Sequence, residues 1–421
     1  MNYKKLMVIS HNCFSKTGSN GRTLANYLSG WPKEKIAQMY IHPEQPDFDV
    51  CSQYYCLSDG AILKSILRKE NPAGFVVRNQ NNEKNEIEFI YKNKKVKNSI
   101  KLLMREFAWK SKLWNRSGFD SWINSFEPEI ILVQAGDAAF LFDLAISIGR
   151  RFKAEIVIYN TEGYYFKEVS YLQENAVSTL FYPILNKKLK KAYERLVKVS
   201  KCEIYNCELL ANDYKRVLHT KNKVIMNTSE FTKETISDTK SNQIIYAGNL
   251  GLNRHKSLID FANAIQKIDS NFVIDVYGKT SDNNIKDEVE GCKGIKLHGF
   301  ISYEELKEKL KKSKYLLHIE SFDDYYREDL KYAFSTKIAD SLAAGSCLFV
   351  YAPENMAVSQ YLKNKNSTIL ITEPSMLEEE IRKVLSDDNL VKRISKNARQ
   401  LAMKNHNIDI NRAEFQKALL D

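Results

Sequence analysis

Short apolar runs alternate with amphipathic segments through the second half of the chain. The runs have four to six residues and lack polar alternation, which predicts strands buried on both faces. We expect these strands at 243–247, 272–277, 295–298, 315–319, 347–351 and 368–371. Helical patterns lie between them, at 256–268, 282–290, 303–312, 335–344, 355–363 and 375–386. Strict alternation of strands and helices predicts a parallel sheet covered by helices, that is, a doubly wound domain.

The first half follows the same pattern less regularly. We expect strands at 6–9, 130–133, 156–159, 203–205 and 224–226, and helices at 21–30, 99–124, 138–152, 176–199 and 208–218. Residues 75–98 are polar and rich in Asn and Lys, which predicts an exposed hairpin or a loop. The fold class is therefore α/β, with two doubly wound, Rossmann-like domains facing a central cleft.

A polar segment without apolar periodicity separates the two halves, and it predicts a linker. We place an N-terminal domain at 1–228, the linker at 229–242 and a second domain at 243–395. Residues 396–421 continue as helices, which we expect to pack back towards the N-terminal domain.

Positive charge is concentrated in the first half of the chain. The net charge is +11, and residues 64–116 hold fourteen Lys or Arg against five Glu. Residues 186–201 hold seven against one, on a helix that also carries Tyr193. With Trp109 and Trp114 in 101–116, this composition is typical of basic helices that bind anionic membrane surfaces peripherally. The alternative is a solvated face above an ordinary core stripe.

Cysteine spacing and hydropathy favour a cytoplasmic protein. The seven cysteines form no CxxC pair, which predicts free thiols in a reducing compartment. The apolar stretch 130–149 is interrupted by Gln134, Asp137 and Asp143, so we expect a strand, a turn and a helix there instead of a membrane span. The apolar stretch near the first residues is too short for a signal peptide.

Two loops of the second half have the composition of an anion site. In Ala247-Gly-Asn-Leu-Gly-Leu-Asn-Arg-His-Lys-Ser257, Gly248 and Asn249 precede two cations, Arg254 and Lys256, at the expected start of a helix. Cations beside free helix N–H groups suit a diphosphate, and the alternative is a turn with two solvated cations. The glycines do not form the GxGxxG pattern of a dinucleotide site.

The second loop opens a short apolar helix that Gly345 closes. Ser335 or Thr336 suits the N-cap, but Lys337 in the first turn is unfavourable with the helix dipole. A bound anion at this helix N-terminus would make the position of Lys337 favourable. Asp340, one turn further on, is placed to accept hydrogen bonds from ribose hydroxyls, so the set suits a nucleoside diphosphate.

These motifs resemble those of the GT-B glycosyltransferases, in particular the retaining family-4-like (group 1) enzymes of bacterial surface polysaccharide synthesis. Phe-Ser-Thr-Lys-Ile-Ala-Asp-Ser-Leu-Ala-Ala-Gly at 334–345 looks like their donor-binding helix, and the loop after Gly248 looks like their phosphate loop. The resemblance covers 243–400 well and the first half only in outline.

The resemblance implies a role for each residue. Arg254 and Lys337 would neutralise the leaving diphosphate, with Lys256 assisting. The remaining donor contacts would be Gly248, Asn249, His298 near the base, Glu320 on the sugar, Ser335, Thr336 and Asp340.

In the first half, the resemblance implies an acceptor-side loop. Its residues would be Gly18, Asn20, Gly21 and Arg22. Asp137 and Glu162 stand where relatives often carry His, and their role is open: sugar contact, acceptor contact, or general base if the enzyme inverts.

This chain departs from the family pattern in its carboxylates. Nineteen residues separate Glu320 from Asp340, where relatives usually have the two seven apart, so retention of configuration is an analogy only. Asp47-Phe48-Asp49 matches a DxD metal motif, but a three-residue match in a Pro-containing loop does not indicate a metal site. We therefore expect metal independence, no cofactor, and a UDP-sugar as donor.

The function expected is transfer of a sugar from a nucleotide-diphosphate sugar to a glycan, lipid-linked, in capsule, O-antigen or exopolysaccharide synthesis. One alternative is a non-hydrolysing sugar-nucleotide epimerase of the same fold. Another is a non-catalytic anion- or nucleotide-binding protein. The chain lacks RNP, KH and helix-turn-helix patterns, so no nucleic-acid partner is expected.

Overall fold

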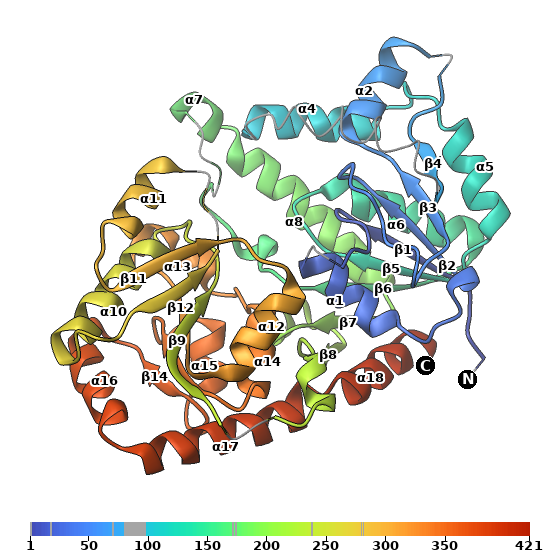
Figure 1. Ribbon diagram of the computed structural model, residues 1–421. Helices are drawn as coiled ribbons and strands as arrows, with labels where there is room; N and C mark the ends of the chain where they lie inside the picture. The colour runs from blue at the N-terminus through green and yellow to red at the C-terminus, as the bar shows by residue number, and fades with distance from the viewer. Residues whose placement is uncertain are drawn as a thin grey trace. The chain divides into compact units, whose positions relative to one another are not determined.

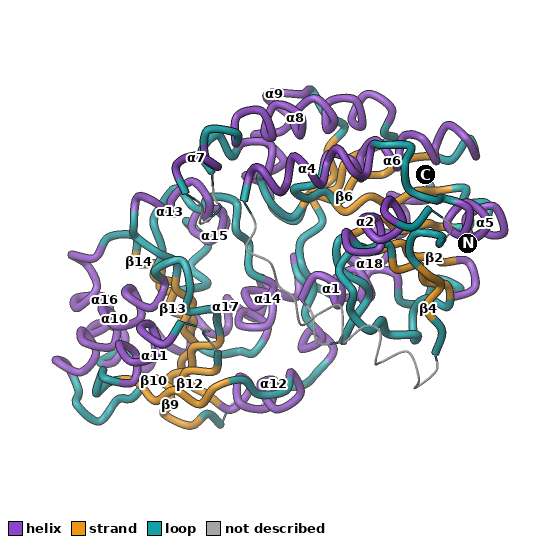
Figure 2. Tube along the Cα trace, turned by 90° about the horizontal axis from the view of Figure 1, so that it is seen from above, coloured by secondary structure: helices purple, strands orange, loops and turns teal. Residues whose placement is uncertain are grey.

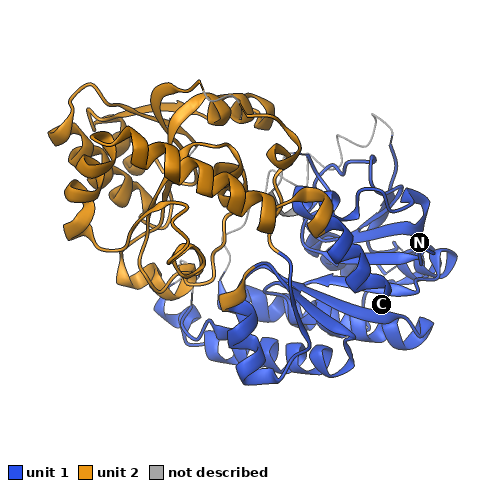
Figure 3. Ribbon diagram, turned by 90° about the horizontal axis from the view of Figure 1, so that it is seen from below, with its two compact units in different colours: residues 1–206, 210–225, 412–421 blue, residues 207–209, 226–411 orange. Residues whose placement is uncertain are grey.

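Each of two compact units contains one central sheet (Figures 1 and 3). The structure is a computed structural model that describes residues 2–16, 19–69, 71–79, 98–170, 172, 175–236, 239–278, 280 and 282–421. Unit 1 comprises 1–206, 210–225 and 412–421, and unit 2 comprises 207–209 and 226–411. The domain limits expected from the sequence, and the roles attached to them, stay predictions.

Unit 1 has an eight-stranded sheet in the order β4-β3-β2-β1-β5-β6-β7-β8. All neighbours are parallel except β3 and β4, which are antiparallel. The strands are β1 Leu6–Ser10, β2 Ile36–Tyr40, β3 Gln53–Cys56, β4 Phe75–Val77, β5 Ile130–Gln134, β6 Glu155–Asn160, β7 Cys202–Tyr205 and β8 Asn222–Val224.

Helices cover both faces of this sheet (Figure 2). They are α1 Ser19–Leu28, α2 Asp59–Leu67, α4 Ser99–Lys110, α5 Ser117–Phe126, α6 Ala139–Phe152, α7 Ala176–Thr179, α8 Tyr182–Val199 and α9 Glu208–Leu218, whose first residues belong to unit 2. Two short 3-10 turns, η1 Lys33–Lys35 and η3 Tyr164–Phe166, complete the unit.

Unit 2 has a six-stranded, wholly parallel sheet in the order β11-β10-β9-β12-β13-β14. Counted from its own first strand, this is the 3-2-1-4-5-6 order of a doubly wound nucleotide-binding sheet. The strands are β9 Ser241–Ala247, β10 Ile274–Tyr277, β11 Ile295–Gly299, β12 Ser313–Ile319, β13 Cys347–Tyr351 and β14 Ile369–Ile371.

The helices of unit 2 alternate with these strands. They are α10 Arg254–Ile268, α11 Asn283–Glu290, α12 Tyr303–Lys312, α13 Asp324–Leu330, α14 Thr336–Ala343, α15 Ala357–Leu362, α16 Leu377–Leu385 and α17 Asp388–Asn405, with 3-10 turns η4 Glu230–Lys233 and η5 Pro374–Met376. The last helix, α18 Ile408–Leu420, begins in unit 2 and continues in unit 1. The expected α/β class with two doubly wound sheets is confirmed.

Sequence periodicity missed β2 and β3 in unit 1. Strand β2 carries Gln38 in its centre, and a polar residue there breaks the apolar run. The structure buries Gln38 completely, and its amide is satisfied. Its Oε1 accepts from the Phe14 N–H at 2.9 Å, and its Nε2 donates to Ser10 Oγ at 2.9 Å. A buried amide therefore holds the loop after β1, because each polar group has a partner.

Two expected helices also differ from the structure, and one helix was not expected. The helix expected at 99–124 is two helices, α4 and α5. The one expected at 176–199 breaks between α7 and α8, where Pro183 stands in the first turn of α8 and cannot continue a preceding helix. Helix α13 was not expected. Of 75–98, the described part contains β4, and 80–97 lie outside the described residues.

The last residues of the chain complete the core of unit 1. Phe415 is fully buried and stacks on Tyr27, with ring centroids 4.4 Å apart. Gln416 Nε2 donates to the carbonyl oxygens of Tyr27 and Ser29, both at 3.0 Å. The end of α18 is thus a structural part of the first sheet's helical layer.

A fully buried histidine joins the start of unit 2 to the end of α17. His406 Nδ1 lies 2.6 Å from the Asn227 carbonyl oxygen, so this nitrogen carries the proton and donates. Its Nε2 then accepts from Tyr361 Oη at 2.9 Å. Burial lowers the pKa of His406 to about 4, against the smaller opposing effect of the Asn227 carbonyl. The ring is therefore neutral and fully hydrogen-bonded in the folded chain.

This histidine should make the stability of the chain sensitive to acid. The unfolded chain takes up the proton near pH 6.5, whereas the folded chain does so only near pH 4. Stability from His406 is thus complete above about pH 6.5 and falls at about 1.4 kcal/mol per pH unit below it. Urea unfolding should show that the free energy of unfolding of the wild type exceeds that of His406→Asn at pH 7, and that this difference becomes smaller down to pH 4.5. The exposed His219, changed to Asn, is the control, and a pH-independent difference would contradict the assignment.

Candidate donor and acceptor sites

The expected donor residues gather at one edge of the unit 2 sheet. Strands β9 and β12 are its central neighbours, and the strand order changes direction between them. Ligands of doubly wound sheets bind at the carboxyl ends of the strands at this point. The loop before α10 follows β9, and Glu320 follows β12.

The loop after β9 is tightly packed and leaves no room for larger residues. A Cβ on Gly248 would lie 2.3 Å from Tyr246 Oη, which itself donates to the Asn249 carbonyl oxygen at 2.9 Å. Asn249 Oδ1 accepts from the Gly251 N–H at 2.8 Å. The loop ends with Asn253 in the left-handed region, with a φ of 58°, and α10 begins at Arg254. Gly248 and Asn249 thus shape the loop that positions Arg254.

Arg254 and Glu320 form a buried ion pair. The Arg254 Nε donates to Glu320 Oε2 at 2.7 Å, and the side chains are 13% and 3% exposed. His318 Nε2 approaches Glu320 Oε1 at 3.3 Å from the other side. Burial disfavours the charged carboxylate, but the Arg254 charge and His318 outweigh it and hold the pKa of Glu320 below its usual value. Both groups are therefore ionised and fixed before any ligand arrives.

Helix α13, which lies between the two expected carboxylates, is tied to the same loop. Asn253 Nδ2 donates to Asp323 Oδ2 at 2.7 Å, and Asp323 is also the N-cap of α13. The Tyr325 N–H, then Asn253, then the charge of Lys256 lower the pKa of Asp323. The nineteen residues between Glu320 and Asp340 thus include a helix whose N-cap is hydrogen-bonded to the loop before Arg254.

The start of α14 has the geometry expected of a capped helix. Ser335 is the N-cap, and its Oγ accepts from the Lys337 N–H at 3.3 Å. Because α14 connects β12 to β13, its N-terminus with Thr336 and Lys337 lies at the carboxyl edge of the sheet. The N-terminus carries no acidic residue in its first turn. This arrangement is compatible with a bound anion.

Asp340 has protein partners that sequence reasoning did not foresee. It is 3% exposed, and it accepts from Ser229 Oγ at 2.7 Å and from Tyr303 Oη at 3.2 Å. The carboxylate therefore links the polar segment after β8 and helix α12 to α14. Its expected ribose contact stays a prediction.

His298 stands near the outer edge of the same sheet. Its Nε2 lies 2.6 Å from Asp275 Oδ1, and its ring stacks on Tyr277 with centroids 4.8 Å apart. These contacts fix the orientation of the imidazole on β11. Its expected position near the base stays a prediction.

In unit 1, the structure pairs Asp137 with a histidine that the sequence analysis missed. His11 Nε2 lies 3.2 Å from Asp137 Oδ1, and the side chains are 14% and 9% exposed. His11 follows β1 and Asp137 follows β5, the two strands between which the order of this sheet changes direction. A Cβ on Gly136 would lie 2.3 Å from His11 Cε1, so only glycine lets the ring lie there. In the sequence, Gly136-Asp137 directly after a buried strand pointed to Asp137, whereas no pattern pointed to His11.

Arg105 connects this pair to α2. Its Nη1 lies 4.0 Å from Asp137 Oδ1, and its Nε donates to Asp59 Oδ1 at 2.8 Å. Asp59 also accepts from Trp109 Nε1 at 2.8 Å. Asp137 therefore lies between a histidine and an arginine, which suits a carboxylate that orients an imidazole.

The other expected first-half residues are less well defined. Glu162 follows β6 and is exposed. A Cβ on Gly21 would lie 2.2 Å from the Cys13 carbonyl oxygen, so this glycine allows α1 to pack closely. Arg22 is partly buried on α1 beside it, Asn20 lies in the same helix, and Gly18 lies outside the described residues.

The DxD-like residues are engaged with a lysine. Lys16 Nζ lies 2.6 Å from Asp49 Oδ2 and 3.7 Å from Asp47 Oδ2. Within the described residues, no group of three His, Cys, Asp or Glu is placed to hold a metal ion. A cation of the protein itself thus faces both carboxylates.

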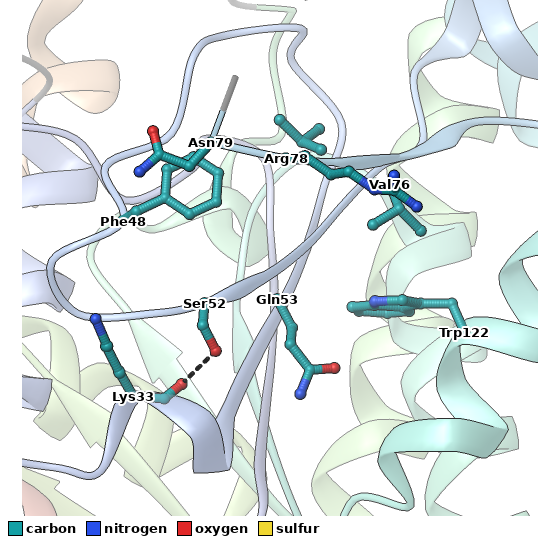
Figure 4. Close-up of a pocket in the computed structure, with 9 residues that line it drawn as sticks. Lys33, Phe48, Ser52, Gln53, Val76, Arg78, Asn79 and Trp122 are labelled. Atoms are coloured by element: carbon teal, nitrogen blue, oxygen red, sulfur yellow. Dashed lines mark hydrogen bonds between the residues drawn. The ribbon is translucent and has the colours of Figure 1, made fainter.

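A pocket of about 440 Å³ lies elsewhere in unit 1, beside strand β4 (Figure 4). Its lining includes Phe48 and Ser52 before β3, Val76 of β4 and Trp122 of α5. None of the expected site residues lines it. Among the helices that the structure describes, none is long and apolar enough to cross a membrane.

Comparisons with known proteins agree with this geometry. Residues 254–416 match the family described as glycosyl transferase-like. Sucrose-phosphate synthase from Thermosynechococcus elongatus has a similar structure, with a TM-score of 0.65, 10% identity, and coverage of 99% of this chain and 98% of that chain. The structure of HepE from Anabaena, in complex with UDP and glucose, matches with a TM-score of 0.64 and 10% identity, over 100% of both chains. The structure of TarM from S. aureus, in a complex that includes UDP, matches with a TM-score of 0.61 and 9% identity, over 100% of both chains. No curated protein matches.

The fold is therefore the GT-B fold. The expected resemblance to the group 1 GT-B glycosyltransferases is confirmed, since the family match spans most of unit 2 and the structural likeness spans the whole chain. Residues 254–416 are thus glycosyl transferase-like, and the likeness to solved structures shows the fold of the whole chain.

Removing Arg254 should destabilise the chain in a pH-dependent manner. Arg254→Ala leaves the buried Glu320 without its main partner, and breaking a buried pair costs about 3–5 kcal/mol. In the wild type, where the pKa of Glu320 is lowered, this stability is present above about pH 4.5 and is lost only as the pH falls through the lower folded value. In the variant, an unpaired carboxylate binds a proton more readily, so the destabilisation should shrink as the pH falls from neutral towards acid.

Urea unfolding of both proteins across this pH range measures the effect. Lys267→Ala is the matched control, because its partner Glu378 lies at an exposed pair of the same unit. An equal loss of unfolding free energy in both variants would show that the buried pair contributes no more to stability than the exposed pair does.

Proposed function

We propose that this chain transfers a sugar from a UDP-sugar to a glycan acceptor. The observation that carries the proposal is the fixed Arg254–Glu320 pair at the edge of a nucleotide-type sheet, beside the α14 N-terminus with Lys337. Two structurally similar proteins, HepE and TarM, are described in complexes with UDP, which supports UDP as the nucleotide.

The chemistry follows from where charge develops. As the bond between sugar and diphosphate breaks, negative charge accumulates on the departing phosphate oxygens. Arg254 uses its Nε–H for Glu320, and a guanidinium has four further N–H donors for those oxygens. Lys337 and Lys256 add charge, and preorganised cations need no reorganisation as the bond breaks. Glu320 would then contact the donor-sugar hydroxyls with its remaining acceptor capacity.

On the acceptor side, we propose that His11 and Asp137 contact the attacking hydroxyl. Their position at the switch point of the unit 1 sheet supports a ligand contact. Asp137 orients the imidazole, which can hydrogen-bond to the acceptor hydroxyl and would accept its proton only if the enzyme inverts. Glu162, Gly21 and Arg22 would contribute to the surrounding acceptor loops. Transfer with retention of configuration, as by a hexosyltransferase, is the outcome by family analogy.

We further propose a lipid-linked acceptor in capsule, O-antigen or exopolysaccharide synthesis. The support is the excess of cations in 101–116 and 185–201, which suits a cytoplasmic enzyme bound peripherally to an anionic membrane. Each Lys or Arg near such a surface contributes about 1 kcal/mol.

The two alternatives make different products. An epimerase would change the donor sugar without any acceptor, and a binding protein would release no nucleotide. Nucleotide release measured with and without mixed lipid-linked acceptors separates the three, and acceptor-dependent release is the expected result.

Loss of either donor cation should cut turnover. Arg254→Ala and Lys337→Ala should each lower kcat by about two to three orders of magnitude, as expected for a lost partner of transition-state charge. The control is again Lys267→Ala. Near-ultraviolet circular dichroism at the assay temperature verifies folding, and Arg254→Lys tests charge without the planar fork. Near-normal turnover in both alanine variants would contradict the assignment of these cations to the diphosphate.

We also expect turnover to be independent of added metal ions. Turnover that is abolished by EDTA and restored by Mg²⁺ would contradict this expectation.

Loss of the acceptor-side pair should affect turnover and leave the donor bound normally. His11→Asn and Asp137→Asn should each lower kcat by about two orders of magnitude, the lower range for a positioned acid–base group. The thermal shift produced by UDP should stay unchanged. His219→Asn is the control. If UDP binding fell as far as turnover, the pair would belong to the donor site or to folding.

A further inference from the structure

Three neighbouring helical segments of unit 1 expose large apolar side chains. Helix α4 contacts α2, α7 and α8, and Figure 1 shows α2, α4 and α7 along one side of this unit. We call the exposed set the apolar face: Leu67 (83% exposed), Leu180 (76%), Phe107 (73%), Met104 (67%), Val177 (62%) and Ile184 (49%). Apolar side chains exposed on contacting helices are candidates for an interaction surface, whereas single exposed apolar residues are normal.

The exposure does not come from a lack of packing beneath these helices. A small core of Leu102, Leu172, Tyr182 and Leu185 holds α4 against α8. Met104 and Phe107, three apart on α4, lie on the opposite side of that helix from this core. On α8, Ile184 likewise alternates with buried Leu185. The apolar face is thus a second apolar surface outside a complete local core.

Cations continue the apolar face along α8. Ile184 is followed at helical spacing by Lys188 and Lys191, with Lys187 beside them, all exposed. Residues 175–193 contain no Asp or Glu. Within the described residues, none of these three lysines has an ion pair. The stripe therefore changes from apolar to cationic over two turns, and no acidic partner from its own segment neutralises it.

On α2, the same combination recurs. The exposed Lys64, Arg68 and Lys69 surround Leu67, and the acidic residue of this helix, Asp59, already pairs with Arg105. On α4, the acidic residue is Glu106, which is 3% exposed and accepts from the Ala139 N–H at 2.8 Å. The exposed surface of all three helical segments is thus apolar and cationic.

We propose that the apolar face inserts into the interfacial region of an anionic phospholipid bilayer, with the flanking lysines at the headgroups. Helices that combine an apolar face with lysines lie in this region. Protein interfaces are depleted in lysine, which disfavours a protein partner for this surface. The inference deepens the peripheral binding in the proposed function and rests on it, but it assigns binding to insertion as well as charge. The aromatic residues expected to contact the membrane, Trp109, Trp114 and Tyr193, are buried. The inference therefore assigns the membrane contact to the apolar face instead.

An introduced tryptophan reports insertion directly. All four native tryptophans are buried, with exposed fractions of 3%, 6%, 4% and 7% for Trp31, Trp109, Trp114 and Trp122. Leu180→Trp therefore adds an exposed indole. We expect its emission to shift to the blue with phosphatidylglycerol–phosphatidylcholine vesicles and to be quenched by brominated acyl chains. The control is Met376→Trp, at a 41% exposed position of unit 2, which should show neither effect.

Two variants separate insertion from charge. Phe107→Ser with Leu180→Ser should weaken vesicle binding by about tenfold or more at low salt, because binding scales with inserted apolar area. Lys187→Glu with Lys188→Glu should do the same. At 1 M salt, where the Debye length is about 3 Å, the wild type should keep a residual binding that the serine variant lacks. Met376→Asp is the control, since Asp suits its helix N-cap position.

Three results would overturn the proposal. They are an absence of wild-type binding at low salt, an unquenched Leu180→Trp indole, and a blue shift that depends on protein concentration without vesicles. The last would identify the face as an interface between two copies, which gel filtration would verify. The thermal shift with UDP, measured on the same variants, reports on the proposed function separately. If the UDP shift is absent while vesicle binding is intact, only the proposed function fails.

Discussion

The carboxyl edge of the unit 2 sheet depends on one buried ion pair, Arg254–Glu320. An unpaired charge in a protein interior is costly, so each partner requires the other. The pair fixes the first residue of α10 against the end of β12, and His318 supports the carboxylate from its other side. Because the hydrogen bond to Glu320 uses one N–H of the guanidinium, the rest of the group stays available to a ligand. Under the proposed function, the same arginine therefore serves both stability and anion recognition.

A related arrangement occurs in unit 1. There too, a polar pair stands at the point where the strand order of a parallel sheet reverses, with His11 after β1 and Asp137 after β5. Doubly wound sheets leave the ends of these strands uncovered by crossover connections, so polar groups can be held there by rigid backbone. Each unit thus presents a preformed polar group at the place where its fold accepts a ligand.

The sequence predicted the second sheet well because its strands are uninterrupted apolar runs. It missed β2 because Gln38 lies inside that strand, and only the loop after β1 explains why a buried amide is tolerated there. The sequence also led to the prediction that Arg254 and Glu320 are site residues, but it did not predict their pairing. Sixty-six positions separate them, and strand order brings them together. A lone histidine such as His11 has no sequence pattern at all, and the burial of Asp340 against Ser229 depends on the same kind of long-range contact.

The central claim is that the edge of the unit 2 sheet binds a nucleoside diphosphate through its phosphates. Calorimetric titration of the full chain with UDP and with uridine tests it most directly, because the two ligands share the base and the ribose. The account predicts measurable heat and saturable binding for UDP, weakened by added salt, and at least tenfold weaker binding for uridine. Equal affinity for both ligands, or binding of neither, would contradict it.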